Sequence, residues 1–409
     1  MAELLSPAGT PEKMAAAFRF GADAVYLAGP AFGMRAAAGN FTEDEICAAV
    51  REAGKNGKKI YITVNTQPRD EEYPALLSYL RTLRACPPDG LIVADLGVLA
   101  TVRKILPDTE IHISTQANIL SAATAEAYAA LGAGRVVLSR ELSLKEIKKL
   151  RERLSREVEL EAFVHGAMCV SYSGRCLLSN YLSGRDACRG ACTQPCRWHY
   201  RVRNISAELE EEKRPGQILP VYEEGGETFF MSSRDLCMIE YIPQLLDAGI
   251  TSFKIEGRMK SAYYTAVLSN AYRMAIDAAE SGKPYDPAWR REAESVSHRP
   301  YDTGYYFSSP HEDAKIYKDD GYLREKTYLA EVLSYNEITG EALFLQHNKV
   351  TPGMQAELLT PGKCGQRFTV GALFSEEGER MECVNRPKTR FRCHLPFPAA
   401  AGDLLRGAE

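Results

Sequence analysis

Short apolar runs that alternate with amphipathic stretches are the feature of this 409-residue sequence that most constrains its fold. Valine, isoleucine, leucine and phenylalanine are nearly continuous in these runs, which is typical of strands buried on both faces of a parallel sheet. The stretches between them, such as 11–21 and 143–154, have the spacing of helices that connect parallel strands. The eight predicted strands lie at 3–7, 24–29, 59–65, 90–95, 110–115, 135–140, 159–166 and 252–258.

Eight strand-then-helix units are the number found in a TIM barrel, and an open doubly wound sheet is the alternative. The count favours a TIM-type (β/α)8 barrel of the α/β class, which we expect over residues 1–310. Beyond about residue 322, alternating strand-like runs are joined by Gly, Asn and Pro turns. This pattern predicts a small, barrel-like all-β domain over 322–409, and such domains commonly bind RNA or a neighbouring domain.

Polar residues close each of the eight predicted strands. In a barrel of this type the active site lies at the C-terminal ends of the strands, so these residues are candidates for a pocket. Uncharged amides at such positions need hydrogen-bond partners when they are buried, and a ligand can supply them. For Ser6 and Asp95, the alternative is that the side chain caps the N-terminus of a helix. The set comprises Ser6, Tyr26, Asn65, Asp95, Gln116, Arg140, His165 and Glu256.

His165 ends the seventh predicted strand, just before a cluster of cysteines. It is either a group that binds substrate and transfers protons or a structural histidine with satisfied hydrogen bonds. Lys254, Glu256 and Arg258 alternate along the eighth predicted strand and so face the same side. Three charges inside a barrel are costly unless they are paired or contact a ligand, so Lys254 and Arg258 predict a site for a small carboxylate.

Five of the eleven cysteines lie between residues 161 and 198, in a segment rich in Gly, Ser and Arg. Four thiolates from such a loop suit either an iron–sulfur cluster or tetrahedral zinc. Zinc sites favour two closely spaced pairs, whereas here only Cys192 and Cys196 are close, as C-x3-C. The spacing therefore favours an iron–sulfur cluster, with structural zinc, disulfides or unliganded thiols as alternatives.

The other cysteines are isolated in the sequence. Cys47 and Cys86 lie in helical surroundings and are predicted to be structural thiols. An odd number of cysteines in a long chain without an export signal argues against a disulfide framework. The N-terminal residues show no signal-peptide pattern and there is no apolar run of about 18 residues, so we expect a cytoplasmic protein without membrane contact.

The net charge of −4 gives no overall attraction for nucleic acid, so any RNA contact requires a local basic patch. An insertion predicted at 183–232, between the seventh and eighth strands, carries arginines next to aromatic residues. That combination is typical of phosphate contact and base stacking, and a solvated basic loop is the alternative. The arginines are Arg185, Arg189, Arg197, Arg201 and Arg203.

Several segments resemble the collagenase-like peptidase family U32: ELLSPAG, ADAVYLAG, FVHGAMCVSYSGRC, RGACTQPCRW and SFKIEGRMKS. The stretch YYTAVLSNAYRMAIDAAESGKPYD and the β domain after it resemble the branch of that family that forms 5-hydroxyuridine at the wobble position of tRNA. The resemblance covers essentially the whole chain. It implies oxygen-independent hydroxylation with a 4Fe-4S cluster, and prephenate as the expected cosubstrate.

The resemblance also implies which cysteines hold the cluster, whereas the other expected site residues follow from their positions at the strand ends. Cys188 stands where relatives often carry Asn and is expected to be a bystander, and Cys237 is the reserve ligand, because a later cysteine substitutes in relatives that lack the fourth ligand. We expect His165 and Glu256 to be catalytic. The expected cluster ligands are Cys169, Cys176, Cys192 and Cys196. The expected cosubstrate-binding residues are Lys254, Arg258, Asn65, Gln116 and Arg140.

Two alternatives to this function stay open, and the family name carries the first of them. A collagenase-like protease is the first, although the sequence has neither a nucleophile elbow nor an HExxH zinc motif. A non-catalytic RNA-binding barrel with a structural cluster is the second. Detection of 5-hydroxyuridine in tRNA separates the predicted hydroxylase from both.

Overall fold

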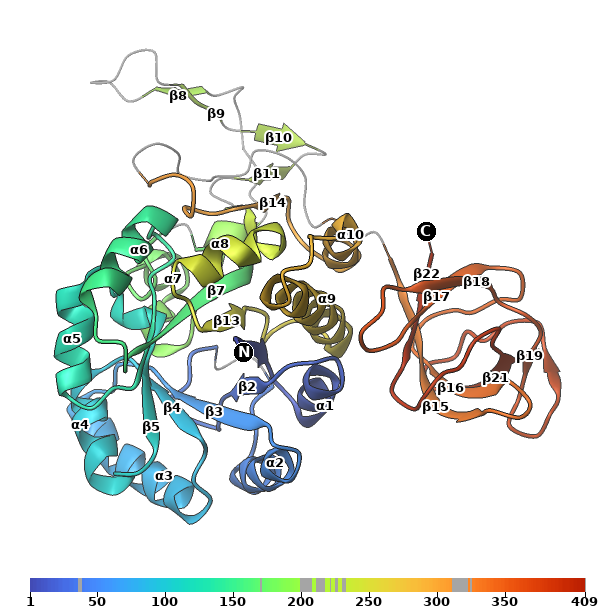
Figure 1. Ribbon diagram of the computed structural model, residues 1–409, viewed down its shortest axis with the longest axis horizontal. Coiled ribbons are helices and arrows are strands. Elements are labelled where there is room, and N and C mark those ends of the chain that lie inside the picture. Colours follow the sequence, from blue (N-terminus) through green and yellow to red (C-terminus); the bar gives the residue numbers. More distant parts are fainter. Residues whose placement is uncertain are drawn as a thin grey trace.

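The computed structural model describes residues 1–35, 39–169, 171–198, 208–210, 218–220, 222–224, 227–229, 233–310, 323 and 326–408. Eight parallel strands form a barrel (Figure 1), and it is closed because the last strand pairs with both the first and the seventh. All eight predicted strands and the TIM-type fold are thereby confirmed. The strands are β1 (Glu3–Pro7), β2 (Ala24–Leu27), β3 (Lys59–Val64), β4 (Gly90–Val93), β5 (Glu110–Ile113), β6 (Arg135–Val137), β7 (Glu159–Ala167) and β13 (Ser252–Ile255).

Helices connect these strands and cover the barrel from outside. Several begin at a side chain that caps free backbone N–H groups; Thr42 and Glu45, for example, form a reciprocal capping box. Asp95 caps its helix by accepting a single hydrogen bond from the N–H of Val98, which confirms the capping alternative for that residue. The helices are α1 (Pro11–Arg19), α2 (Glu43–Lys55), α3 (Tyr73–Ala85), α4 (Leu96–Ile105), α5 (Ala122–Ala130), α6 (Leu144–Arg153), α8 (Ile242–Asp247), α9 (Ala262–Glu280) and α10 (Pro287–Glu294).

Cys47 of α2 and Cys86, at the end of α3, form a disulfide with their Cα atoms 5.4 Å apart. The prediction that these two residues are separate thiols was therefore wrong. The two helices follow neighbouring strands of the barrel, which brings together cysteines that lie 39 residues apart in the sequence. None of the described helices combines the length and apolar composition needed to cross a membrane.

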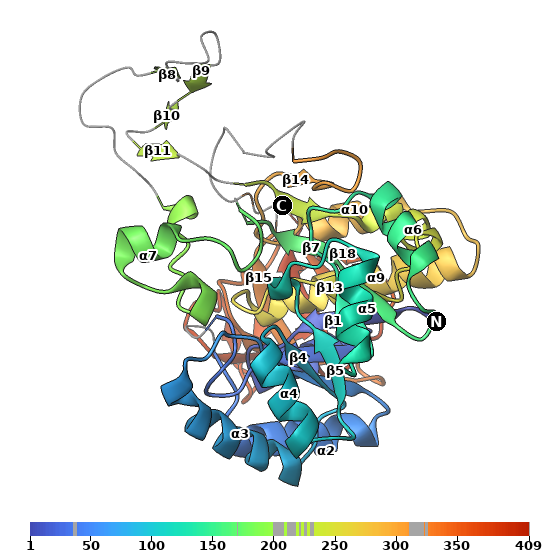
Figure 2. The same ribbon diagram turned by 90° about the vertical axis from the view of Figure 1, so that its left-hand side faces the viewer.

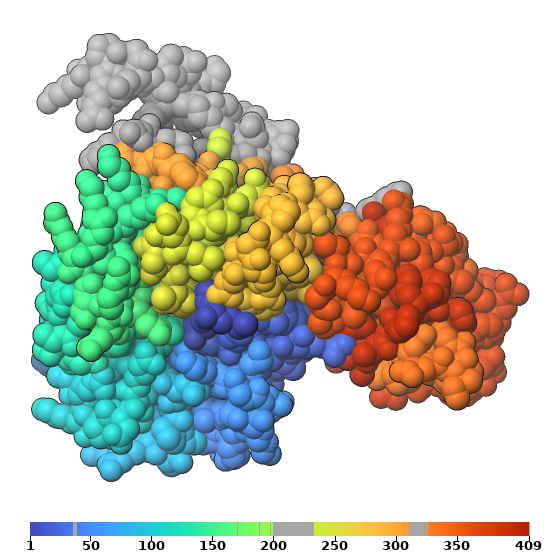
Figure 3. All heavy atoms as spheres, in the orientation of Figure 1, coloured from blue at the N-terminus to red at the C-terminus, as the bar shows by residue number. Residues whose placement is uncertain are grey.

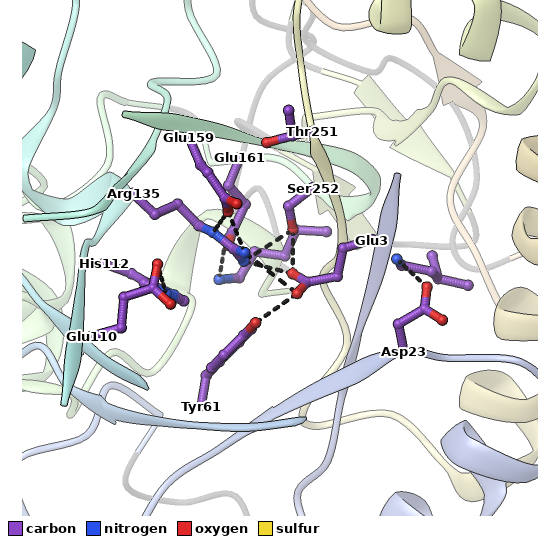
Figure 4. Close-up of polar contacts among 12 residues, drawn as sticks. Glu3, Asp23, Tyr61, Glu110, His112, Arg135, Glu159, Glu161, Thr251 and Ser252 are labelled. Carbon is purple, nitrogen blue, oxygen red and sulfur yellow. Dashed lines mark hydrogen bonds and ion pairs between the residues drawn. The ribbon is translucent and has the colours of Figure 1, made fainter. Parts of the chain in front are cut away.

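The barrel interior is ionic at its N-terminal end (Figure 4), although the predicted strands are mostly apolar. Arg135 is 2% exposed and contacts Glu3 at 2.5 Å, Glu159 at 2.6 Å and Glu161 at 3.3 Å. Glu161 also accepts a hydrogen bond of 2.6 Å from Lys254 on β13. The apolar side chains of these strands instead pack mainly outward, against the helices. A chain of ion pairs therefore runs inside the barrel from Glu3 toward the C-terminal strand ends.

The segment between β7 and β13 carries the cysteine cluster and its own short elements. Its helices are α7 (Leu178–Ser183) and the 3-10 turns η3 (Ala187–Arg189) and η4 (Pro195–Arg197). Its strand pairs are β8 (Glu208–Glu210) with β9 (Ile218–Pro220) and β10 (Tyr222–Glu224) with β11 (Glu227–Phe229). In Figure 2, α7 lies at the opposite end of the barrel from the N terminus, beside the C-terminal strand ends. Further on, β12 (Asp235–Cys237) pairs with the end of β7 and with β14 (Tyr301–Asp302), and the 3-10 turn η5 (Ile239–Tyr241) follows it.

A second domain, orange to red in Figure 3, consists of one eight-stranded antiparallel sheet with its own apolar core. This confirms the predicted C-terminal β domain. Leu359 and Leu404 of this domain also join the core of the barrel, so the two cores are in contact. The strands are β15 (Tyr328–Asn336), β16 (Glu341–Gln346), β17 (Gln355–Leu359), β18 (Gln366–Thr369), β19 (Leu373–Phe374), β20 (Arg380–Met381), β21 (Arg390–His394) and β22 (Leu404–Gly407).

Polar contacts with α9 and α10 hold the β domain against the barrel. Arg406 of β22 is completely buried and forms ion pairs with Glu292 of α10 at 2.7 Å and with Glu357 at 2.8 Å. Asn270 of α9 donates to the carbonyl of Lys363 and accepts from the N–H of Gly362, both at 2.7 Å. The interface is therefore specific in geometry, and the β domain is packed on the barrel at a defined position.

We expect Asn270→Ala to lower the free energy of unfolding by about 1 to 3 kcal/mol, because it leaves two backbone groups at the interface without their partner. Chemical unfolding of the wild-type protein and of Asn270→Ala measures this loss of stability. Asn336→Ala is the matched control, since exposed Asn336 also bonds two backbone N–H groups, in a turn where water can replace it. Equal losses in the two variants would contradict a specific role for Asn270.

Candidate active site

A pocket lies at the C-terminal ends of the barrel strands, and nine of the eleven predicted site residues line it. His165 and Cys196 are the two that do not. The charged lining residues come mainly from β13, from β6 and from the loop after β2, whereas β3, β4 and β5 contribute uncharged residues. The nine are Asn65, Gln116, Arg140, Cys169, Cys176, Cys192, Lys254, Glu256 and Arg258.

Lys254 lies at the floor of the pocket and is already paired. Its ammonium group donates to Glu161 at 2.6 Å and lies 4.5 Å from the centre of the Tyr26 ring. Burial alone would raise the pKa of Glu161, but the charges of Lys254 and Arg135 outweigh it and hold that pKa below its ordinary value. Lys254 therefore supplies a fixed positive charge whose strongest contact is with the protein.

Glu256 is the carboxylate in the middle of the pocket. It accepts a hydrogen bond of 3.0 Å from the hydroxyl of Tyr26 and lies 3.7 Å from the guanidinium of Arg35. Burial opposes its ionisation, yet Arg35, Arg140 and the Tyr26 hydroxyl together lower the pKa of Glu256. The side chain is therefore ionised at neutral pH and can accept a proton.

Arg258 is the cation of the pocket with the least compensation. It is 2% exposed, donates to the hydroxyl of Thr63 at 3.3 Å and forms no ion pair with any described residue. Burial lowers the pKa of Arg258 and the charge of Arg35 adds to this effect, while Tyr26 and Glu256 oppose it without outweighing it. A buried guanidinium that lacks a carboxylate partner is suited to bind an anion.

The two predicted amide residues differ in their contacts. Asn65 accepts from the N–H of Met34 at 3.0 Å and donates to Ser114 at 3.2 Å, so its amide ties the loop after β2 to β5. Gln116 follows β5, and its Oε1 atom is buried without a hydrogen-bond partner in the described part of the chain. The hydroxyl of Ser171, which lies in the segment between β7 and β13 that carries the cysteine cluster (the cysteine segment), is likewise buried without a hydrogen-bond partner among the described residues.

Arginine side chains surround the cysteines that face the pocket. Arg140 donates to the carbonyl of Ala167 at 2.7 Å and to Ser173 at 2.8 Å, and its Nη2 lies 3.6 Å from the sulfur of Cys169. Burial alone would lower the pKa of Arg35. The interactions with Glu256, Cys169 and Cys192 outweigh burial, so the pKa of Arg35 is raised. The cysteines thus lie among positive charges, which favour thiolates.

Two further cysteines lie outside the pocket lining. Cys196 is on the turn η4, four residues after Cys192. Cys237 is buried on β12, with its sulfur 3.7 Å from the hydroxyl of Tyr272, on the helix side of the sheet. This geometry disfavours Cys237 as a reserve ligand. Among the residues whose side chains are described, no three His, Cys, Asp or Glu side chains are close enough to hold a single metal ion.

His165 lies behind the barrel wall, away from the pocket. Its ring nitrogens contact the hydroxyls of Tyr272 at 3.2 Å and Tyr301 at 3.1 Å. Burial, with smaller contributions from nearby positive charges, keeps its pKa well below the ordinary value. The geometry favours the structural alternative for this residue.

A shift in the strand ladder explains this position. Phe163 faces the pocket opposite Lys254, but the next pair is His165 with Ile255, so β7 contains one extra residue there. The bulge reverses the alternation of the strand, and His165 points outward although Phe163 points inward. Strict alternation would have placed both inside the barrel.

The predicted basic insertion is only partly described. Arg201 and Arg203 lie outside the described residues, as do the side chains of Arg197 and Cys188. Arg189 forms an ion pair of 2.5 Å with Glu72, which ties the insertion to the barrel. Arg185 is exposed, so it is available for contact with RNA.

Arg35 and Ser171 are pocket residues that the sequence analysis missed. Arg35 has a positive φ of 65° and lies in the loop after β2, beyond the strand end at which candidates were sought. Ser171 lies between two predicted cluster ligands. A search of whole strand-to-helix loops, not only strand ends, would have included both residues.

Two family models match the chain, Peptidase family U32 over residues 9–316 and Peptidase family U32 C-terminal domain over residues 324–406. The tRNA hydroxylation protein P of Escherichia coli (strain K12) is 35% identical, over 97% of this chain and 94% of that protein. The tRNA hydroxylation protein P1 of Bacillus subtilis (strain 168) is 35% identical, over 99% and 94%. A 23S rRNA 5-hydroxycytidine synthase of Escherichia coli (strain K12) is 36% identical, over 68% and 39%. This chain belongs to peptidase family U32.

Proposed function

We propose that this protein hydroxylates the wobble uridine of tRNA to 5-hydroxyuridine without using molecular oxygen. The observation that carries the proposal is the pocket at the barrel mouth, where cysteines, guanidinium groups and an ionised carboxylate meet uncharged hydrogen-bonding groups. Relatives named as tRNA hydroxylation proteins align over 94% of their length, which includes the β domain. A relative named as an rRNA 5-hydroxycytidine synthase supports the same kind of reaction on a pyrimidine.

The proposed cofactor is a 4Fe-4S cluster. Three of its proposed ligands line one pocket, and Arg35 and Arg140 supply the positive charge that favours thiolate ligands. Such a cluster supplies one-electron transfer when it is bound. The ligands would be Cys169, Cys176, Cys192 and Cys196.

The residues of this chain bind the substrates and move a proton. Replacing the C5–H of uracil by C5–OH is a two-electron oxidation of the base, so we propose that the cosubstrate gives up an oxygen atom to C5 and is itself reduced by the same two electrons. The C5 hydrogen leaves as a proton, which ionised Glu256 in the same pocket would accept. Arg258 would bind a carboxylate of the cosubstrate, for which we propose prephenate, with Lys254 as a fixed charge beneath it. The proposed activity on tRNA also accords with a cytoplasmic location.

We expect Arg258→Lys to raise the prephenate concentration needed for half-maximal hydroxylation by about 10- to 100-fold. The reason is that lysine cannot reproduce a two-pronged guanidinium–carboxylate contact worth about 1.5 to 3 kcal/mol. Kinetics at varied prephenate measure this change, while iron content shows that the cluster is retained. Arg153→Lys, a change at an exposed residue of α6, is the control. An unchanged requirement for prephenate in Arg258→Lys would contradict the assignment.

The test of the function uses protein purified without air. It is incubated with prephenate and with tRNA from cells that lack the modification, and the nucleosides are then analysed by mass spectrometry. The expected product is 5-hydroxyuridine, with a gain of one oxygen atom. Absence of the product, with iron-loaded protein and intact tRNA, would refute the proposed function.

The protease alternative has less support in the geometry. No histidine lines the described part of the pocket, so no described lining residue can serve its cysteines or serines as the histidine base that a nucleophile usually requires. Cleavage of denatured collagen by the same preparation would favour the protease. A non-catalytic RNA-binding barrel predicts tRNA binding with neither product.

A further inference from the structure

One wall of the pocket is formed by uncharged residues. Strands β3, β4 and β5 and the residues that directly follow them contribute Thr63, Asn65, Ile92, Ser114, Thr115 and Gln116. Arg258 contacts this wall at Thr63, and Arg140 follows β6, the neighbour of β5. The other charged groups, from β13 and from the loop after β2, come from strands three places from β5 in either direction around the barrel. An anionic cosubstrate is therefore drawn to the charged side, and the neutral wall is left for an uncharged group.

Gln116 is the residue of this wall whose hydrogen bonding is incomplete. Its Oε1 atom is buried without a partner among the described residues, whereas the amide of Asn65 is used at both ends by Met34 and Ser114. A buried carbonyl oxygen loses free energy unless a donor reaches it. No described residue supplies that donor, so a ligand that presents an N–H or O–H group would complete the hydrogen bonding of Gln116.

The cysteine segment closes over the same atom. Gly174 has a φ of +75°, and a Cβ atom there would lie 2.7 Å from both the main-chain oxygen and Oε1 of Gln116. Ser171, from this segment, places a second buried and unpartnered hydroxyl in the pocket. A ligand bound to Gln116 is thereby held beside the segment that joins Cys169 to Cys176.

We propose that this wall is the nucleobase subsite and that Gln116 Oε1 accepts the N3–H of uracil, so that Gln116 selects uridine over cytidine. The inference rests on the proposed function and assigns to Gln116 the recognition of the uridine that is hydroxylated. Uracil presents one donor, N3–H, on its Watson–Crick edge, and Ser171 can donate to the oxygen beside it. Cytosine has an acceptor at N3, which would oppose Oε1. Enzymes that modify a base commonly extrude it and read this edge in a pocket.

The experiment is a cycle that combines one change in the protein with one in the RNA. An anticodon stem-loop RNA carries either uridine or 3-methyluridine at the wobble position, and the methyl group removes the N3–H donor. Dissociation constants of the full-length, cluster-loaded protein are measured by fluorescence anisotropy at one salt concentration, because salt alters affinity. We expect the methylated RNA to bind wild-type protein about tenfold more weakly, and the two RNAs to bind Gln116→Met equally.

Two further variants separate recognition from folding. Gln116→Glu keeps an acceptor at this position and should preserve the discrimination. Gln346→Met is the matched control, because Gln346 is a buried glutamine of the β domain that also has an unpartnered Oε1. It should behave as wild type.

The outcomes separate failure of base recognition by Gln116 from failure of the proposed hydroxylation of tRNA. If wild-type protein and Gln116→Met show the same ratio of affinities between the two RNAs, Gln116 does not read the base and the inference fails. Hydroxylation of tRNA would still stand in that case. If wild-type protein binds neither RNA, the proposed function fails, and the inference fails with it.

Discussion

Replacement of Arg135 by methionine is expected to lower the free energy of unfolding by about 3 to 5 kcal/mol. Arg135 is almost fully buried and contacts Glu3, Glu159 and Glu161 inside the barrel. Removal of the guanidinium leaves buried Glu161 and partly buried Glu3 with less compensation for their charges, and methionine fills the space without restoring that compensation. Denaturant unfolding monitored by circular dichroism measures the loss.

Glu159→Gln is the matched control, because Glu159 contacts the same guanidinium at 2.6 Å but its side chain is 46% exposed. Water compensates an exposed charge, so we expect a loss of about 0 to 1 kcal/mol. Equal losses in Arg135→Met and Glu159→Gln would show that burial does not determine the strength of these ion pairs.

The network also predicts how stability depends on pH. The pKa of Glu161 is lowered in the folded protein, against an ordinary value of 4.5. The stability that comes from this shift is complete above pH 4.5 and is lost as the pH falls through the lowered folded-state pKa. Arg135→Met should show a smaller loss of stability over this acidic window than wild-type protein.

Replacement of Cys192 by serine is expected to remove the bound iron and to abolish hydroxylation of tRNA. Cys192 lines the pocket, accepts a hydrogen bond of 3.4 Å from the N–H of Gln194 and helps to raise the pKa of Arg35. A serine hydroxyl is a poor substitute for a thiolate ligand, because it does not ionise near neutral pH. Iron analysis and the visible absorbance of protein purified without air measure the loss.

Cys237→Ala and Cys188→Ser are the controls for this prediction. Cys237 is buried beside Tyr272 on the helix side of the sheet, so its removal should leave the iron in place. Cys188 is the expected bystander of the cysteine segment. Full iron content in Cys192→Ser, or loss of iron in Cys237→Ala, would overturn the proposed set of ligands.

The alternation of apolar and helical stretches determined the architecture of this protein. Each buried parallel strand needs a continuous apolar run and each connection needs a helix, so strand number and order were readable from local sequence. The rule that barrel sites form at strand C-terminal ends then located Asn65, Gln116, Arg140 and Glu256, all of which line the pocket. The density of cysteines located the segment that closes over it.

Contacts between distant residues were decided only by the tertiary structure. Asn65 and Gln116 look alike in sequence, but only Asn65 has protein partners for both ends of its amide. Cys47 meets Cys86 because two helices lie on neighbouring strands. Lys254 is paired with Glu161, which removes it from the set of uncompensated cations. Each of these outcomes depends on where the closed barrel places side chains from different strands.

The bulge in β7 shows the physical reason most directly. Sequence patterns report a period of two along a strand, and by that period His165 belongs with Glu161 and Phe163 inside the barrel. One extra residue opposite β13 reverses the direction of the side chain. Nothing in the local pattern records that residue, because a bulge is defined by the register between two strands. Strand identity was therefore set by local sequence, whereas the direction of His165 was set by the pairing of β7 with β13.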